Sequence, residues 1–180
     1  MKTIIVLAMH GAPPNDFPKN EIGELFGLHA RLESSSGPER ATLERRHEEL
    51  EAKMRIWPRS IQNDPFHAGS LELAGRLRLA TELEVITGFN EFCAPTLDDA
   101  FDLAIKQGAE RVVVITPMMT RGGEHSETDI PKAIKRTQEL HPNIEIVFAW
   151  PFDVTQVAQF LANQAADFIY KESFYGTRAG

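Results

Sequence analysis

Residues 3–9 read Thr-Ile-Ile-Val-Leu-Ala-Met and are followed directly by His10 and Gly11. A continuous run of aliphatic and β-branched residues is typical of a strand buried on both faces, as strands are in a parallel sheet. Such runs recur further along the chain, at 83–89, 111–117 and 144–150. The sequence therefore predicts four buried strands.

Helical segments are predicted between and after these strands, over 70–82, 96–107, 127–140 and 153–169. For the segment at 96–107, Pro95 suits the first turn and Gly108 lies just beyond the last one. Strands that alternate with helices form a parallel sheet with right-handed crossovers and helices on both faces. We therefore predict one small α/β domain over 1–170, followed by a tail at 171–180.

The predicted strand order, numbered along the chain, is 2-1-3-4. In this order the first and third strands are neighbours at the point where the chain reverses its winding direction. Ligands of open α/β sheets bind in the crevice at such a point, outside the carboxyl ends of the strands. The residues that follow strands 3–9 and 111–117 are thus the first place to look for a site.

Residues 12–69 form an insertion that is far longer than an ordinary connection between a strand and a helix. Within it, 38–57 is strongly charged, and apolar or aromatic residues recur every three or four positions, at Leu43, His47, Leu50, Met54 and Trp57. This spacing predicts a helix with one narrow buried seam. We expect it to pack on the body of the domain; a lid over the site and a dimer contact are the alternatives.

The composition excludes several classes of protein. The chain has 180 residues, 42% of them hydrophobic, with a net charge of −7 and no basic stripe, which argues against a nucleic-acid partner. The single cysteine, Cys93, excludes a disulfide framework and a cysteine zinc site. No stretch approaches the roughly 20 apolar residues of a membrane span. The apolar run at 4–8 is too short for a signal peptide, so we expect a cytoplasmic protein.

Two histidines follow the strands that flank the expected crevice. His10 comes directly after the first strand, and His125 lies in the loop that opens after the third. Adjacent parallel strands are ~4.8 Å apart, so loops from their carboxyl ends can bring two imidazoles to one point. Neutral imidazole is a common ligand of divalent transition metals, and two of them leave coordination positions open. We therefore predict a metal site at His10 and His125.

Acidic residues lie near both histidines. Glu91 stands between two phenylalanines at the carboxyl end of the second strand, where apolar neighbours favour a role as proton acceptor. Glu124 and Glu127 flank His125 and could orient it or attract a cation. We expect Asp129 to cap or charge the first turn of the following helix, with Pro131 near its start.

These motifs, taken together, resemble those of the CbiX-type class II chelatases, the sirohydrochlorin cobaltochelatases and ferrochelatases. The resemblance covers residues 1–12 and 66–165. It is carried by His10-Gly11, Phe89-Asn90-Glu91, Pro95-Thr96-Leu97, Gly108-Ala109-Glu110-Arg111, Gly122-Gly123-Glu124-His125 and Asp129-Ile130-Pro131. It implies a chelatase fold and a homodimer.

The resemblance also implies a reaction, the ATP-independent insertion of Co²⁺ or Fe²⁺ into a tetrapyrrole. His10 and His125 would bind the metal and, with Glu91, accept the pyrrole protons. Ni²⁺ would also accept imidazole ligands. The expected pocket residues are four apolar side chains for the macrocycle and one arginine for a peripheral carboxylate: Phe89, Phe92, Met118, Met119 and Arg121.

The chain departs from the family pattern at two places. Ala12 stands where the family commonly has a serine after His-Gly, and no histidine follows the fourth strand, where Pro151-Phe152-Asp153 stands. A non-catalytic metal or tetrapyrrole carrier is therefore an alternative. A histidine phosphatase is a weaker one, because Met9 replaces the arginine that clamps phosphate in that class.

Overall fold

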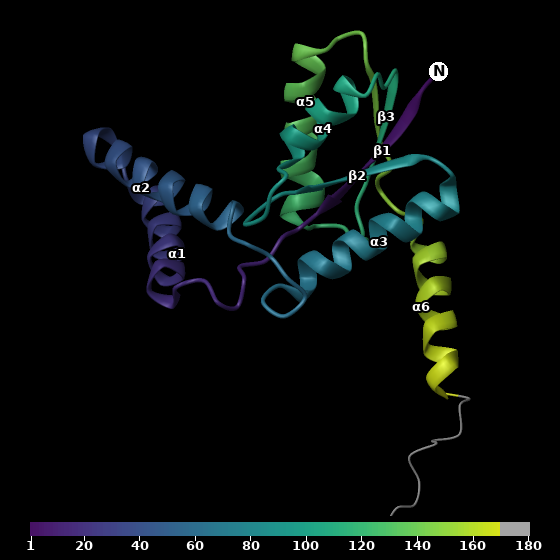
Figure 1. Ribbon diagram of the computed structural model, residues 1–180, viewed down its shortest axis with the longest axis horizontal. Helices are drawn as coiled ribbons and strands as arrows, with labels where there is room; N and C mark the ends of the chain where they lie inside the picture. Colours follow the sequence, from purple (N-terminus) through teal and green to yellow (C-terminus); the bar gives the residue numbers. More distant parts are fainter. Residues whose placement is uncertain (170–180) are drawn as a thin grey trace, which may run out of the picture.

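The computed structural model describes residues 1–169, and four parallel strands form its centre (Figure 1). The strands are β1 (Thr3–Met9), β2 (Glu84–Phe89), β3 (Arg111–Ile115) and β4 (Glu145–Phe148). Their order is β2-β1-β3-β4, so the predicted sheet is confirmed. The predicted tail at 171–180 lies outside the described residues.

Helices cover both faces of this sheet. One face carries α4 (Leu97–Lys106) and α5 (Ile130–Leu140), and the other carries α3 (Pro65–Thr81). The core under α4 and α5 is built from fully buried β-branched, alanine and phenylalanine side chains, among them Val6, Val112, Val114, Ala100 and Phe101. This core holds the strands in register and thereby fixes the edge at which the histidines emerge.

Two strands end earlier than predicted. β3 ends at Ile115 and β4 at Phe148, each two residues before the expected end. Each strand ends where its pairing with the neighbouring strand ends: the last paired residues are Leu7 with Ile115 and Val114 with Phe148. Beyond those pairs the chain leaves the sheet and turns toward the site.

The starts of two helices also differ from the predictions. α4 begins at Leu97 and not at 96, because Thr96 caps it: the Thr96 hydroxyl accepts from the Asp99 N–H, and the Asp99 carboxylate accepts from the Thr96 N–H. Pro95 therefore precedes the helix and does not lie in its first turn. α3 begins at Pro65, five residues before its predicted start, with Asp64 as the N-cap.

The insertion contains a pair of helices set to one side of the sheet (Figure 1), α1 (Lys19–Ser34) and α2 (Gly37–Arg55). α2 corresponds to the helix predicted at 38–57, and its seam is buried as expected. The seam packs mainly against α1, however, and not along the sheet. The two helices share a separate hydrophobic cluster, which contains Phe17, Leu25, Leu28, Leu43, Leu50 and Met54.

The last described helix, α6 (Val154–Ile169), projects away from the sheet (Figure 1). None of its residues is buried, and Val154, Leu161 and Phe168 are exposed along one face at a spacing of seven. Within residues 1–169, each helix is too short or too polar to cross a membrane.

Candidate active site

The backbone brings His10 and Glu91 together. β1 and β2 are neighbours, and their pairing continues past the strand ends. The Asn90 N–H donates to the Met9 carbonyl, and the Glu91 N–H donates to the His10 carbonyl, both at 2.9 Å. His10 and Glu91 are therefore adjacent because the pairing of β1 and β2 extends beyond the regular part of the sheet.

Gly11 permits this close approach. Its φ is +104°, and a Cβ at this position would lie 1.9 Å from the carbonyl oxygen of Glu91. Any side chain would push apart the loops that carry His10 and Glu91, so the glycine is a steric requirement of the site.

His125 reaches the same edge from a π-helical turn, η1 (His125–Asp129), that runs directly into α5. The helix predicted to begin at Glu127 thus begins two residues earlier. π-helical turns are rare and are frequently found at functional sites. Here the turn places the histidine over the ends of β1 and β2.

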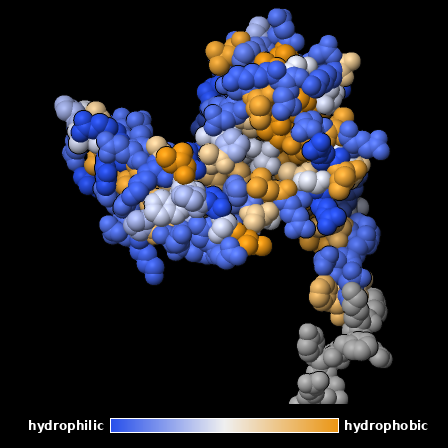
Figure 2. All heavy atoms as spheres, in the orientation of Figure 1, coloured by the Kyte–Doolittle hydropathy of each residue, from blue (hydrophilic) through white to orange (hydrophobic). Residues whose placement is uncertain are grey.

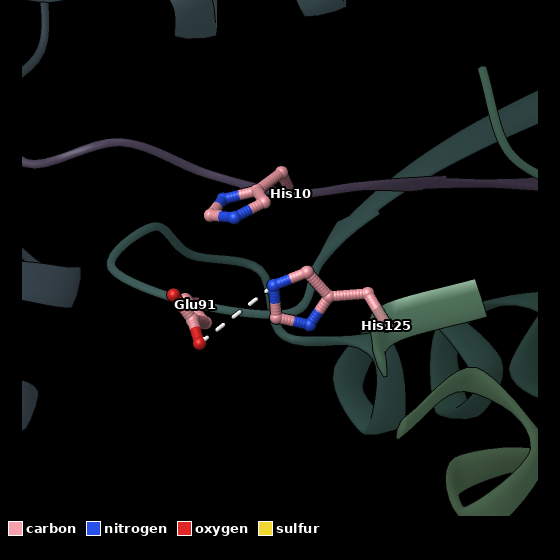
Figure 3. Close-up of side chains that lie close together, drawn as sticks. All are labelled: His10, Glu91 and His125. Atoms are coloured by element: carbon pink, nitrogen blue, oxygen red, sulfur yellow. Dashed lines mark ion pairs between the residues drawn. The ribbon is translucent and has the colours of Figure 1, made fainter. Parts of the chain in front are cut away.

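The three side chains converge on one point (Figure 3). One nitrogen or oxygen from each of His10, Glu91 and His125 lies within 4.8 Å of the others. The two imidazole rings meet edge to face, with centroids 4.4 Å apart, and His125 Nε2 lies 3.8 Å from Glu91 Oε1. All three are partly buried, so the group is accessible but shielded. Two nitrogens and one carboxylate oxygen are a suitable ligand set for a divalent transition metal.

Hydrogen bonds to the other ring nitrogens define which nitrogen of each histidine is free. His10 Nδ1 lies 2.7 Å from the carbonyl oxygen of Gly11, which can only accept, so Nδ1 carries the proton. His125 Nδ1 lies 2.8 Å from Asp129 Oδ2, and it donates to that carboxylate. Both Nε2 atoms are left with their lone pairs available, as a metal ligand or proton acceptor requires.

Asp129 occupies the N-cap position of α5, as predicted, but its side chain has a role that was not predicted. Its side chain makes no capping hydrogen bond to α5, and it orients His125 instead. The spacing of four residues from His125 is the sequence signal that could have indicated this contact. Of the other two acids, Glu127 accepts from the Gly122 N–H at 3.0 Å and shapes the loop, while Glu124 lines a cavity beside the site.

Arg59 was not singled out in the sequence, yet it joins both site loops to the insertion. It is 7% exposed, and it pairs with Asp64, which is 1% exposed. Its guanidinium donates to the carbonyls of Ala12, Phe92 and Met54. Ala12 lies two residues after His10 and Phe92 lies one after Glu91, so a buried cation connects the two loops. No local pattern marks one arginine in so long an insertion.

Cys93 lies beside this ion pair and is fully buried. Burial raises the pKa of its thiol, the largest of several influences. A protonated, enclosed thiol is a poor metal ligand, so we do not add Cys93 to the group of His10, Glu91 and His125.

Two hollows border the group. The first, of about 360 Å³, lies between the α1–α2 pair and the site loops (Figure 2) and includes Glu51, Glu91, Glu124 and Asp129 in its lining. Within residues 1–169, no lysine or arginine lines it. The second, of about 390 Å³, is bordered by Met118, Met119 and His125, among others. We name them the acidic cavity and the methionine cavity.

The five predicted pocket residues lie in different surroundings. Met118 and Met119 line the methionine cavity, and Phe92 lines the acidic cavity with its ring 6.5 Å from that of His10. Phe89 has no exposed surface and stacks on His67, so its ring supports the site from within the core. Arg121 is exposed and lines neither cavity.

The chain is similar in sequence to several known proteins. The family model described as CbiX matches residues 66–167, more than half of the chain. A Priestia megaterium protein named sirohydrochlorin ferrochelatase is 32% identical over 68 residues, which is 38% of this chain and 25% of the relative. A Saccharolobus islandicus protein named sirohydrochlorin cobaltochelatase is 36% identical over 70 residues, which is 36% of this chain and 54% of the relative. The matches thus cover between a quarter and about half of these relatives.

A solved structure shares the fold. The CbiX protein of Marinobacter aquaeolei VT8 superimposes with a TM-score of 0.52 over 94% of this chain and 99% of that one, at 17% sequence identity. The family match includes Glu91 and His125, and β1 adds His10 from outside the matched segment. By its sequence match, this chain belongs to the CbiX family.

Proposed function

We propose that this protein is a chelatase that inserts a divalent metal, Co²⁺ in the first place or Fe²⁺, into sirohydrochlorin without ATP. The observation that carries the proposal is the convergence of His10, Glu91 and His125 within 4.8 Å. The names of the relatives support the substrate, since both cobalto- and ferrochelatases are among them.

The reaction exchanges two pyrrole protons for one metal ion, so the site must bind a cation and then accept protons. The Nε2 atoms of His10 and His125 can do both, because each is the unprotonated nitrogen of its ring. Glu91 supplies a negative charge that favours the cation first and a proton afterwards. These groups and solvent can accept both pyrrole protons, so the exchange requires no nucleotide.

The macrocycle would lie against the methionine cavity. Met118 and Met119 offer apolar, adaptable surface next to His125. The acidic cavity is less suitable, since its four carboxylates would repel the carboxylates of sirohydrochlorin.

The test mixes the protein, sirohydrochlorin and Co²⁺ in the absence of ATP and follows the visible spectrum. The wild-type chain should accelerate metallation over the uncatalysed rate, and His125→Ala should abolish the acceleration. His141→Ala, which removes a histidine at the end of α5, is the matched control and should retain it. Tight macrocycle binding without acceleration would contradict the proposal and identify a carrier. Rates with Co²⁺, Fe²⁺ and Ni²⁺ would then identify the preferred metal.

We further propose that the protein acts as a homodimer. The support is α6, which has no buried residue and exposes Val154, Leu161 and Phe168 on one face. An apolar helical face of this kind is typical of an association surface. The chain mass is 20.2 kDa, and light scattering after size exclusion should give twice this value. Leu161→Glu with Phe168→Glu should give the monomer mass; a monomeric wild type would contradict the proposal.

A further inference from the structure

A second pair of imidazoles faces the acidic cavity. His29 on α1 and His47 on α2 both line it, and their ring centroids are 5.9 Å apart. They belong to the wall formed by the insertion, whereas Glu91 and Asp129 belong to the opposite wall, formed by the site loops. One cavity is thus lined both by Glu91, which belongs with His10 and His125 to the proposed metal-binding group, and by two further histidines.

The separation of the two rings fits a shared ion. An imidazole nitrogen binds a divalent transition metal at about 2.0–2.1 Å, which puts the ring centroid about 3.2 Å from the ion. Two rings bound to one ion would have centroids about 5.2 Å apart at a tetrahedral angle and about 6.4 Å apart in a straight line. The observed 5.9 Å lies between these values. His29 is exposed and His47 is half-buried, so an ion from solvent can reach them.

The surroundings favour a cation. Glu51 follows His47 by one helical turn and lines the same cavity, together with Glu91, Glu124 and Asp129. Glu51 is paired with Arg55 at 2.7 Å, so the negative charge of the cavity comes from the other three carboxylates. In the part of the chain described, no lysine or arginine lines the cavity, and these carboxylates attract a divalent ion and repel a polyanionic macrocycle.

A short chain of aromatic contacts connects the two histidine pairs. Phe26 lies one turn before His29 on α1, and its ring is 5.9 Å from that of Phe92. Phe92 in turn lies against His10 at 6.5 Å. The insertion is therefore held beside the metal-binding group.

We infer that His29 and His47 form a second, weaker site for the divalent metal, from which the ion passes through the acidic cavity to His10, Glu91 and His125. Two protein nitrogens hold an ion less strongly than two nitrogens and a carboxylate, and a weaker outer site can release its ion inward. The insertion thus has a binding role. The proposed transfer of the ion from this second site rests on the proposed chelatase function, but binding at the site is tested with the metal alone.

The experiment measures Co²⁺ binding by titration calorimetry and by the visible d–d absorption of the ion, without any macrocycle. The wild-type chain should bind two Co²⁺ ions. His10→Ala with His125→Ala should retain one weaker ion, His29→Ala with His47→Ala should retain one tighter ion, and the variant with all four changes should bind none. His141→Ala should still bind two.

Three results would overturn the inference: a single ion bound by the wild type, no ion bound by the His10 and His125 variant, or two ions retained without His29 and His47. His29→Gln with His47→Gln keeps side chains of similar size and is the second variant if the alanine pair unfolds. Failure of the chelatase proposal would look different, because Co²⁺ would then bind while sirohydrochlorin stayed unmetallated.

Discussion

Asp129 Oδ2 accepts a hydrogen bond from His125 Nδ1 at 2.8 Å, one turn further along the same π-helical segment. This contact fixes the ring so that Nε2 faces His10 and Glu91. One covalently continuous turn therefore supplies both the proposed metal ligand His125 and the group that orients it.

Replacement of this carboxylate is the first prediction. Asp129→Asn keeps the size of the side chain but removes the charge, and carboxylates in this position typically contribute 10- to 100-fold to metal affinity. We expect a weakening of Co²⁺ binding at the His10–His125 group of about that size, measured by calorimetry. Glu127→Gln, in the same turn but bonded to the Gly122 N–H, is the control. Equal affinities for wild type and Asp129→Asn would refute the orienting role.

Gly11→Ala should damage both stability and the site. The added Cβ would meet the Glu91 carbonyl, and a φ of +104° is itself strained for alanine. We expect the free energy of unfolding to fall by about 2–3 kcal/mol and Co²⁺ affinity to fall with it. Gly27→Ala in α1 adds a Cβ with no neighbour within 4 Å and should instead be stabilising by about 0.5–1 kcal/mol. Urea unfolding measures both, and a neutral Gly11→Ala would disprove the steric requirement.

Arg59→Met should be strongly destabilising. It would leave Asp64 buried without its cation, and loss of one partner from a buried ion pair costs about 3–5 kcal/mol. The carbonyls of Ala12 and Phe92 would lose their donor as well. Arg76→Ala breaks an exposed pair with Glu72 and should change stability by less than about 1 kcal/mol. Urea unfolding curves compare the two variants. Similar midpoints would count against a stabilising role of the buried Arg59–Asp64 pair.

The pH dependence of stability should depend on His67. Burial lowers the pKa of this imidazole below its ordinary value of 6.5, with the ring stacked on Phe89. The unfolded chain then binds the proton more readily than the folded chain. The contribution of His67 to the free energy of unfolding is therefore complete above pH 6.5 and is lost as the pH falls below this value. Thermal unfolding of His67→Phe should show a smaller loss between pH 7.5 and 5 than the wild type. His141→Phe should keep the wild-type slope; an unchanged slope in His67→Phe would exclude this residue as the source.

The predictions from sequence were most accurate where local pattern and burial agree. β1 was predicted at its observed bounds, because seven consecutive apolar or β-branched residues have few other structures open to them. The strand order followed from the alternation of strands and helices, and this order brought His10 and His125 to one edge of the sheet. Predicted boundaries were wrong where a helix cap or the pairing with a neighbouring strand decides them, as at Thr96 and Ile115.

The insertion was the least predictable part. α1 was missed because Gly23 and Gly27 weaken its intrinsic helix propensity and its stability comes from α2, a partner that the sequence does not identify. The role of Arg59 was invisible for the same reason, since its acceptors at Ala12, Met54 and Phe92 are distant in the chain.

The sequence by itself determined the sheet, its order and the two histidines, because strand periodicity and crossover handedness are local rules. Only the tertiary structure decided that Arg59 joins the site loops and that His29 and His47 face the same cavity. Those contacts arise when segments far apart in the chain pack together, and their energies depend on burial, which no short stretch of sequence defines.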